Sequence, residues 1–207
     1  MAKRLIPRFS RKDSQEFIQT LNRRVNQYFK DNKIAKTGNW KLYFKSIIMF
    51  TLLIAPFVLI LSLNISDWFK LLLAVINGVG MAGVGMNVMH DGNHGSFSKN
   101  PLVNKLMGGS IYILAGNVFN WKIQHNVLHH TYTNIKDHDE DLEAGIVLRF
   151  SKHTKWQPYH RFQHFYSIFL YGLLTLKWAF FTDFIQLTRY QKRNLSYVNS
   201  KSHSTQW

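Results

Sequence analysis

Two long apolar runs without a charged residue constrain this chain more than any other feature. Residues 46–66 and 71–89 hold 21 and 19 uncharged residues, and only the short break 67–70 separates them. Each run is about the length that a helix needs to cross a hydrocarbon core, roughly 20 residues. A soluble core built by 207 residues could hardly bury both runs. The sequence therefore predicts a transmembrane helical hairpin with spans at about 46–66 and 71–89.

The second run is rich in small residues, which let the backbone of a neighbouring helix approach closely. We expect the hairpin contact to use some of these positions, which are Asn77, Gly78, Gly80, Ala82, Gly83 and Gly85.

The strong positive charge has two ordinary explanations, a nucleic acid or an anionic membrane surface. The formal net charge is +15, and residues 1–45 carry twelve Lys or Arg against three acids. Because basic residues accumulate on the cytoplasmic side of membrane helices, we expect 1–45 to be a basic cytoplasmic N-terminal segment. The hairpin turn at 64–68 is then outside, and the chain from about His90 is inside again. Most Phe and Leu residues lie in the charge-free runs and do not alternate with basic residues as base-stacking platforms, so we expect no nucleic-acid partner.

Two later segments complete the expected fold, an all-α membrane protein. The uncharged run 106–121 is short and broken by glycines, which favours an interfacial or re-entrant helix. Residues 165–182 form a third apolar helix, interrupted by Lys177, that is long enough for a third span. If this helix crosses completely, the basic tail after Asp183 lies outside, against the positive-inside tendency. The sequence leaves that conflict open.

Histidines are concentrated in a pattern that indicates a metal site. Ten histidines in this chain would give about 0.5 pairs at i, i+4 by chance, whereas three pairs occur. They are His90/His94, His125/His129 and His160/His164, and His130 follows the second pair directly. Residues four apart lie on the same side of a helix, so two imidazoles can reach one ion. We expect five of them, His90, His94, His125, His129 and His130, to bind metal at the end of the hairpin.

The residue types restrict the chemistry of that site. The chain has no cysteine, which excludes thiolate-bound metals and disulfides. No His-Glu-x-x-His motif of the zinc hydrolases occurs, and no Glu-x-x-His motif of the di-iron carboxylate bundles occurs. A set of imidazole ligands suits iron, zinc or copper.

At these residues the chain resembles the membrane fatty acid desaturases, and it is most similar to their linoleoyl-CoA-like, front-end branch. The resemblance is carried by two histidine boxes, His90-Asp91-Gly92-Asn93-His94 and His125-x-x-x-His129-His130. The stretches 121–134, 138–141 and 160–164 add to it. It covers most of the chain from about residue 41, and implies a partial fatty acid desaturase domain at 46–207, multi-pass in the membrane with its boxes facing the cytoplasm.

The resemblance also implies the cofactors and partners. These are two iron ions in a non-haem di-iron centre held by the box histidines, O₂ as co-substrate, and electrons from a separate electron-transfer protein. The substrate is an acyl-CoA or a phospholipid in the bilayer, and no catalytic residue is expected beyond the metal ligands. Each box histidine should bind iron through one ring nitrogen while the other faces a hydrogen-bond partner. Asp91 is a candidate for such a partner.

The chain departs from the family pattern in two ways. The third histidine box, which should follow a fourth span, does not occur, and neither does the His-Pro-Gly-Gly motif of the cytochrome domain fused to some front-end members. We therefore expect an N-terminal portion of a desaturase, with an incomplete iron site.

Other residues are weaker candidates. His160 and His164 could add ligands or anchor a helix end at the interface. The acidic stretch 138–141 could support the ligands from behind, but a solvated turn is slightly favoured. Four polar or aromatic residues near the second box could line an acyl channel or fix water: Asn117, Asn120, Trp121 and Gln124. His153 is expected to be an ordinary surface residue.

Two other functions compete with the desaturase. A related membrane fatty acid hydroxylase shares the histidine boxes and differs only in its product, which chromatography would identify. A histidine-lined metal transporter would place histidines or acids near the middle of its spans, whereas these histidines lie at the edge.

Overall fold

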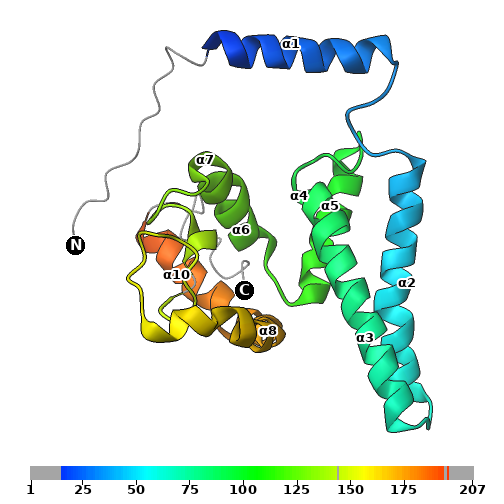
Figure 1. The fold of residues 1–207 in the computed structure, drawn as a ribbon. Helices are drawn as coiled ribbons and strands as arrows, with labels where there is room; N and C mark the ends of the chain where they lie inside the picture. Colours follow the sequence, from blue (N-terminus) through cyan, green and yellow to red (C-terminus); the bar gives the residue numbers. More distant parts are fainter. Residues whose placement is uncertain (1–14, 144, 194, 196–207) are drawn as a thin grey trace.

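The computed structural model describes residues 15–143, 145–193 and 195, and within them it contains helices and no strand (Figure 1). This confirms the all-α prediction. The ends of the two predicted domains, at 1–14 and 196–207, lie outside the described residues.

The predicted helical hairpin is present. α2 (Trp40–Ser62) starts at Asn39, whose side chain accepts a hydrogen bond from the Lys41 N–H at 3.0 Å. After a turn at 63–66 the chain returns through α3 (Asp67–Gly83), a π-helical segment (Val84–Met89) and α4 (His90–Asn93). These three form one continuous helix of 27 residues, and α2 has 23. Both are long and apolar enough to cross a membrane. The second helix extends beyond its predicted span at both ends, whereas α2 begins six residues before its predicted span and ends four residues before the predicted end.

Small residues bring the two helices of the hairpin together, as expected. A Cβ on Gly80 would lie 2.3 Å from the backbone nitrogen of Leu53, so the two backbones touch there. The Asn77 side chain donates a hydrogen bond to the Leu53 carbonyl. Gly78 faces open space, and the expectation does not apply to it.

The run 106–121 is not one helix, so the prediction of a single interfacial or re-entrant helix is wrong. α5 (Pro101–Gly109) passes into a 3-10 turn (Ser110–Leu114), and the helix ends at Ala115, which has a φ of 61°. α5 packs on α4, where a Cβ on Gly92 would lie 2.4 Å from the Gly108 nitrogen.

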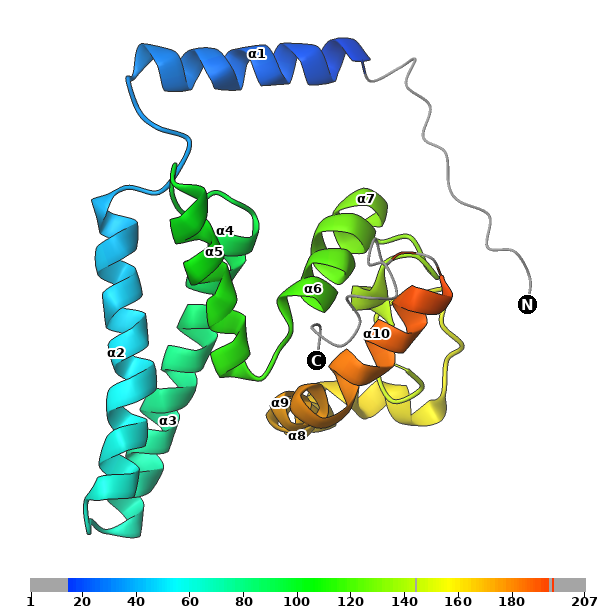
Figure 2. The same cartoon turned by 180° about the vertical axis from the view of Figure 1, so that it is seen from behind.

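The second half of the described chain is a separate group of helices. α6 (Val118–Trp121), a π-helical segment (Lys122–His129) and α7 (His130–Tyr132) form one continuous helix. A 3-10 turn (Glu140–Leu142) follows in the next loop. Figure 2 shows α10 (Asp183–Lys192) beside this helix, and the Asn120 side chain donates to the Asp183 carbonyl at 2.8 Å.

The third apolar segment is helical but bent. It runs through a 3-10 turn (Pro158–Phe162), α8 (Gln163–Gly172), α9 (Leu174–Lys177), a π-helical segment (Trp178–Thr182) and α10. The parts before and after Leu173 are bent by 58°. The described part of the chain therefore has two helices that could span a membrane, or three if the bent pair counts as one.

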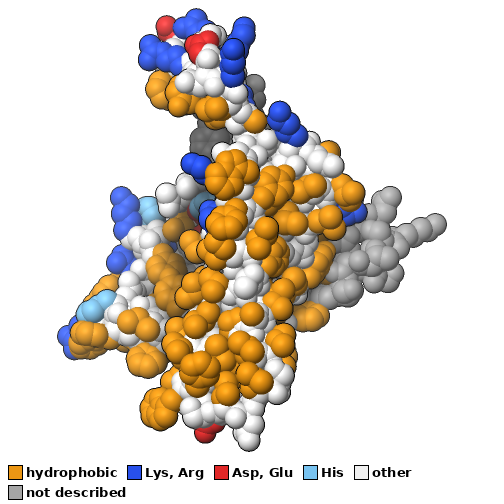
Figure 3. Space-filling model, turned by 90° about the vertical axis from the view of Figure 1, so that its right-hand side faces the viewer, with side chains coloured by type: hydrophobic (Ala, Val, Ile, Leu, Met, Phe, Trp, Pro, Cys, Tyr) orange, Lys and Arg blue, Asp and Glu red, His pale blue; other side chains and the backbone are white. Residues whose placement is uncertain are grey.

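α1 (Gln15–Asp31) precedes the hairpin and has no buried residue. It lies across the end of the hairpin where α2 begins (Figure 1). Most of α2 and α3 exposes apolar side chains (Figure 3).

Candidate metal centre

The structure brings the five box histidines together. His90 and His94 lie at the end of the hairpin, and the other three lie on the helix that contains α6 and α7. The His94 ring centroid is 4.5 Å from that of His90, 5.1 Å from that of His125 and 5.0 Å from that of His130. Two segments that are separated in sequence by thirty residues thus form one cluster of imidazoles.

The nitrogen atoms have a spacing that fits metal binding. The Nε2 atoms of His125 and His130 are 3.3 Å apart. One potential ligand atom from each of His90, His94 and His125 lies within 4.8 Å of the other two. Two nitrogens bound to one zinc-like ion at about 2.1 Å each lie at most about 4.2 Å apart. His125 and His130 already satisfy that limit, and the nitrogens of His90, His94 and His125 need only a small shift to meet it.

A π-helical segment accounts for the pairing of His125 with His130. The N–H of His130 donates to the carbonyl of His125, five residues earlier, which is the hydrogen bond of a π-helix. In an α-helix the i, i+4 partner His129 would hold the position facing His125. The sequence pattern singled out the three histidines but did not reveal which two share a face.

Trp121 forms one wall of the cluster. Its ring stacks on His125 with centroids 4.5 Å apart and meets His94 edge-on at 5.6 Å. It is only 8% exposed and packs with Met89 and Ile111. The indole therefore excludes water from one side of the imidazoles.

The cluster favours neutral imidazoles. Burial, followed by the nearby His130 and His90, lowers the pKa of His125 to about 4. Burial and the same kind of neighbours also lower the pKa of His94. A metal binds the neutral ring, so these two side chains have a lone pair available near pH 7.

Asp139 holds His129 from behind. Its Oδ1 lies 3.1 Å from the Nδ1 of His129, and the Asp139 side chain is 1% exposed. Asp141 also approaches Nδ1, at 3.1 Å. A hydrogen bond from Nδ1–H accounts for these distances and leaves Nε2 free for a metal. Burial raises the pKa of Asp139, but hydrogen bonds from the Asn134 N–H, from His129 and from the Asp141 N–H outweigh it, and the net pKa is lowered.

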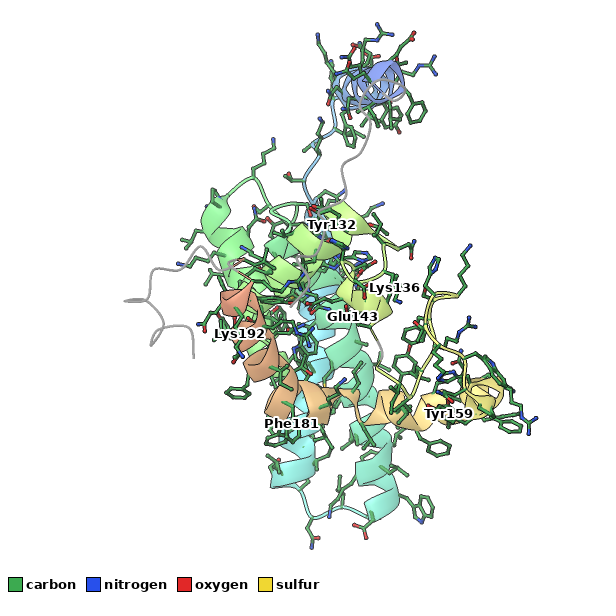
Figure 4. The ribbon with its side chains drawn as sticks, turned by 90° about the vertical axis from the view of Figure 1, so that its left-hand side faces the viewer. Tyr132, Lys136, Glu143, Tyr159, Phe181 and Lys192 are labelled. Atoms are coloured by element: carbon green, nitrogen blue, oxygen red, sulfur yellow. The ribbon has the colours of Figure 1, made fainter. Side chains whose placement is uncertain are left out.

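Glu140 fixes the same loop to α10. Its side chain is 5% exposed and accepts hydrogen bonds from the Tyr190 hydroxyl at 2.7 Å, Arg193 at 3.1 Å and Arg189 at 3.2 Å. Figure 4 shows the end of α10, marked by Lys192, beside the loop that carries Glu143. The prediction of a solvated turn at 138–141 is therefore wrong for Asp139 and Glu140, because each carboxylate is buried against partners.

A second set of side-chain hydrogen bonds also joins α10 to the second box and to the loop that follows it. The Gln186 side chain donates to the Gln124 amide oxygen at 2.8 Å, and Gln124 donates to Asp141 at 3.0 Å. The partners on α10 were missed by the sequence reasoning, since no local pattern links them to residues 46 to 62 positions earlier.

The remaining candidate residues from the sequence do not join the cluster of imidazoles, although Asp91 contacts one of them. Asp91 Oδ1 lies 3.2 Å from His90 Nδ1, the position expected of its hydrogen-bond partner. His160 is buried, with Nε2 2.9 Å from the Ile146 carbonyl and Nδ1 accepting from the Gln157 N–H, so both nitrogens are engaged away from the cluster. The His164 ring lies against Phe165. Asn117 caps α6, and Asn120 is buried against α10. His153 is exposed, as expected.

Comparison with known proteins shows which family this chain is similar to. Residues 66–204 match the family model described as fatty acid desaturase. An sn-1 linoleoyl-lipid 6-desaturase of Arthrospira platensis is 36% identical over 163 residues, which are 79% of this chain and 44% of that protein. The enzyme of the same name from Synechocystis sp. is 30% identical over 84% of this chain and 48% of its own length. An acyl-lipid (8-3)-desaturase of Physcomitrium patens is 34% identical over 84% of this chain and 36% of its own.

The chain thus spans less than half the length of these curated relatives. No solved structure matches it.

Proposed function

Since the chain belongs to the fatty acid desaturase family, we propose that its five box histidines contribute to a non-haem di-iron centre and that the protein introduces a double bond into fatty acyl chains. The observation that carries the proposal is the convergence of five imidazoles at one end of an apolar hairpin. When bound, iron would activate O₂ for removal of hydrogen from an unactivated methylene.

The residues of the chain have distinct tasks in this proposal. His90, His94, His125 and His130 supply nitrogen ligands. His129 supplies its Nε2, because its Nδ1 is held by Asp139. Trp121 excludes water from one wall, and the low pKa of His125 keeps that ligand neutral. Asp91 orients His90.

The substrate class follows from the position of the site and from the relatives. The imidazoles lie at the end of the apolar hairpin, so an acyl chain in the bilayer has a short path to them. The relatives are named as desaturases of acyl groups on lipids. We therefore propose a lipid-linked acyl chain as substrate, with acyl-CoA as the alternative carrier, and a separate protein as electron donor.

The proposed topology places the histidines on the cytoplasmic side, supported by the twelve basic residues that precede the first apolar run. The domain at 46–207 then begins with the hairpin. The bent third segment would not cross the membrane. Its start is tied to Arg149 through Gln163 at 3.0 Å, and its end is tied to Glu140 through Arg189. Both ends return to the loops after the second box, so the basic residues of α10 lie on the same side as the histidines.

Metal analysis of the purified full chain tests the proposal. We expect iron to copurify, and His125→Ala to lose most of it, while His153→Ala serves as a matched histidine control outside the cluster. Expression in a host without polyunsaturated lipids, followed by gas chromatography, tests the activity. Zinc without iron, or equal iron in both variants, would contradict the metal assignment. A hydroxylated product would establish the hydroxylase instead.

A further inference from the structure

The amphipathic helix α1 leaves a row of apolar side chains without cover. Phe17, Leu21 and Tyr28 recur at helical spacing and are 66%, 45% and 58% exposed, and Val25 lies beside them at 42%. This apolar stripe faces one side of the helix, because residues three, four and seven apart lie on one face. No residue of α1 is buried.

Basic residues occupy the rest of the helix. Arg23 and Lys30 lie opposite the apolar stripe by helical spacing, and Arg24 lies at its border. At the top of Figure 3, hydrophobic side chains cover the side of α1 that faces the hairpin, and charged side chains cover the other side. An apolar face with a basic opposite face is typical of helices that lie in a membrane interface.

The ends of the hairpin indicate where that interface lies. Trp40 at the start of α2 is 71% exposed, and Trp68 at the start of α3 is 83% exposed. Exposed tryptophans at both ends of apolar helices mark the two membrane–water interfaces. Trp40 therefore sets one interface at the end of α2 that is nearest α1. Residues 32–39 connect them, and eight residues reach at most about 29 Å, so α1 is held close to this level.

We propose that α1 lies in the plane of the bilayer surface, with Phe17, Leu21, Val25 and Tyr28 in the headgroup–acyl boundary and with Arg23 and Lys30 facing anionic headgroups. This places the apolar face about 5–10 Å into the boundary. A second copy of the chain is a poorer occupant, because two α1 helices packed face to face would bring their Arg24 side chains together. The proposal rests on the membrane placement of the hairpin and is independent of the desaturase chemistry.

The absence of cysteine makes the test direct, since a single introduced thiol can carry a fluorophore. Three variants of the full chain are labelled with an environment-sensitive dye: Val25→Cys on the apolar stripe, Gln19→Cys on the opposite face, and Ile54→Cys on α2. Each is reconstituted into phosphatidylcholine vesicles with or without phosphatidylglycerol, containing lipids that carry a spin-label quencher at a shallow or a deep position. We expect the dye at 25 to shift to the blue and lose most of its emission to the shallow quencher. The dye at 19 should remain as in water, and the dye at 54 should respond to the deep quencher.

Any other result would overturn the proposal for α1 or one of its premises. Equal, unquenched emission at 25 and 19 with quenching at 54 overturns the proposal for α1 and leaves the hairpin in the membrane. An unquenched dye at 54 shows that the membrane placement itself fails. A blue shift at 25 that lipid quenchers do not affect, and that fades on dilution, shows a second copy on the stripe. Phosphatidylglycerol should strengthen the quenching at 25, and the Arg23→Glu, Lys30→Glu double variant should lose that dependence. Equal quenching without phosphatidylglycerol would refute the headgroup contact.

Discussion

At the scale of single residues, Asp139 shows how a buried carboxylate can fix an imidazole that we propose as a metal ligand. It is 1% exposed and accepts hydrogen bonds from three donors, one of which is the Nδ1–H of His129. Such a contact selects the tautomer and direction of a metal-binding imidazole. The affinity of the site for metal should therefore depend on a residue that does not touch the metal.

The variant Asp139→Asn tests this dependence. The amide keeps the size of the side chain but removes the charge that favours the Nδ1–H tautomer, so we expect metal affinity to fall by about 10-fold. Titration with Co²⁺ in the presence of a competing chelator measures it. Asp67→Asn, at the exposed start of α3, is the matched control and should bind normally. Equal affinities in the two variants would show that Asp139 does not orient a ligand.

The lowered pKa of His125 makes a second residue-level prediction, for the metal-free protein. The pKa is about 4 in the folded chain and 6.5 ordinarily, so between these values the unfolded chain binds more protons. Stability then falls as the pH is lowered from about 6.5 to about 4. Thermal unfolding in detergent should show a lower midpoint at pH 5 than at pH 7, and His125→Ala should weaken this dependence. A midpoint that rises on acidification would contradict the assignment.

At the scale of elements, the hairpin depends on one close approach between α2 and α3. Gly80 lies against the Leu53 backbone, whereas Gly78, two residues earlier, has nothing within 4 Å of an added Cβ. The two glycines therefore form a matched pair in one helix. Substituting each of them by alanine distinguishes the effect of helix propensity on stability from the effect of packing.

We expect Gly80→Ala to destabilise the hairpin by about 1–3 kcal/mol, because the methyl group forces the helices apart. Gly78→Ala should be neutral or stabilising by up to about 1 kcal/mol, since alanine favours a helix over glycine. Chemical denaturation in detergent, followed by circular dichroism, compares them. Similar losses in both variants would mean that the helices do not meet at Gly80.

The elements also show what the sequence could predict. The hairpin and the two boxes were predictable because charge-free length and histidine spacing are local properties of the chain. The pairing of His125 with His130 was not, because the π-helical turn departs from the α-helical period on which the spacing rule rests. The break at Ala115 was missed because an uncharged run carries no sign of a left-handed residue. Glu140 was misread because its partners lie on α10, far along the chain.

At the scale of the whole molecule, Glu140 joins the second box to the C-terminal helix. Arg193 is 24% exposed, Arg189 is 43% exposed, and both bind this one buried carboxylate. Removing one partner of a buried ion pair typically costs about 3–5 kcal/mol, and partial exposure of the arginines reduces this cost. The arrangement of α10 beside α6 and α7 therefore depends strongly on one side chain.

Glu140→Gln should lower the free energy of unfolding by about 2–3 kcal/mol and speed hydrogen exchange in α10. Glu143→Gln, which also faces Arg189 but is 35% exposed, should cost at most about 1 kcal/mol. Unchanged exchange in α10 after Glu140→Gln would show that other contacts hold it in place.

The π-helical segment at Lys122–His129 makes the number of residues in the second box as important as their identity. The contact between His125 and His130 needs four residues between them, and these are fitted into a turn that holds one residue more than an α-helical turn. Deleting Val127 or Leu128 would let the segment relax into an α-helix in which His130 becomes the fourth residue after His125, so this pair would still share a face. Inserting one residue there would instead carry the following imidazoles about 100° around the axis, and would dismantle the cluster without removing a histidine.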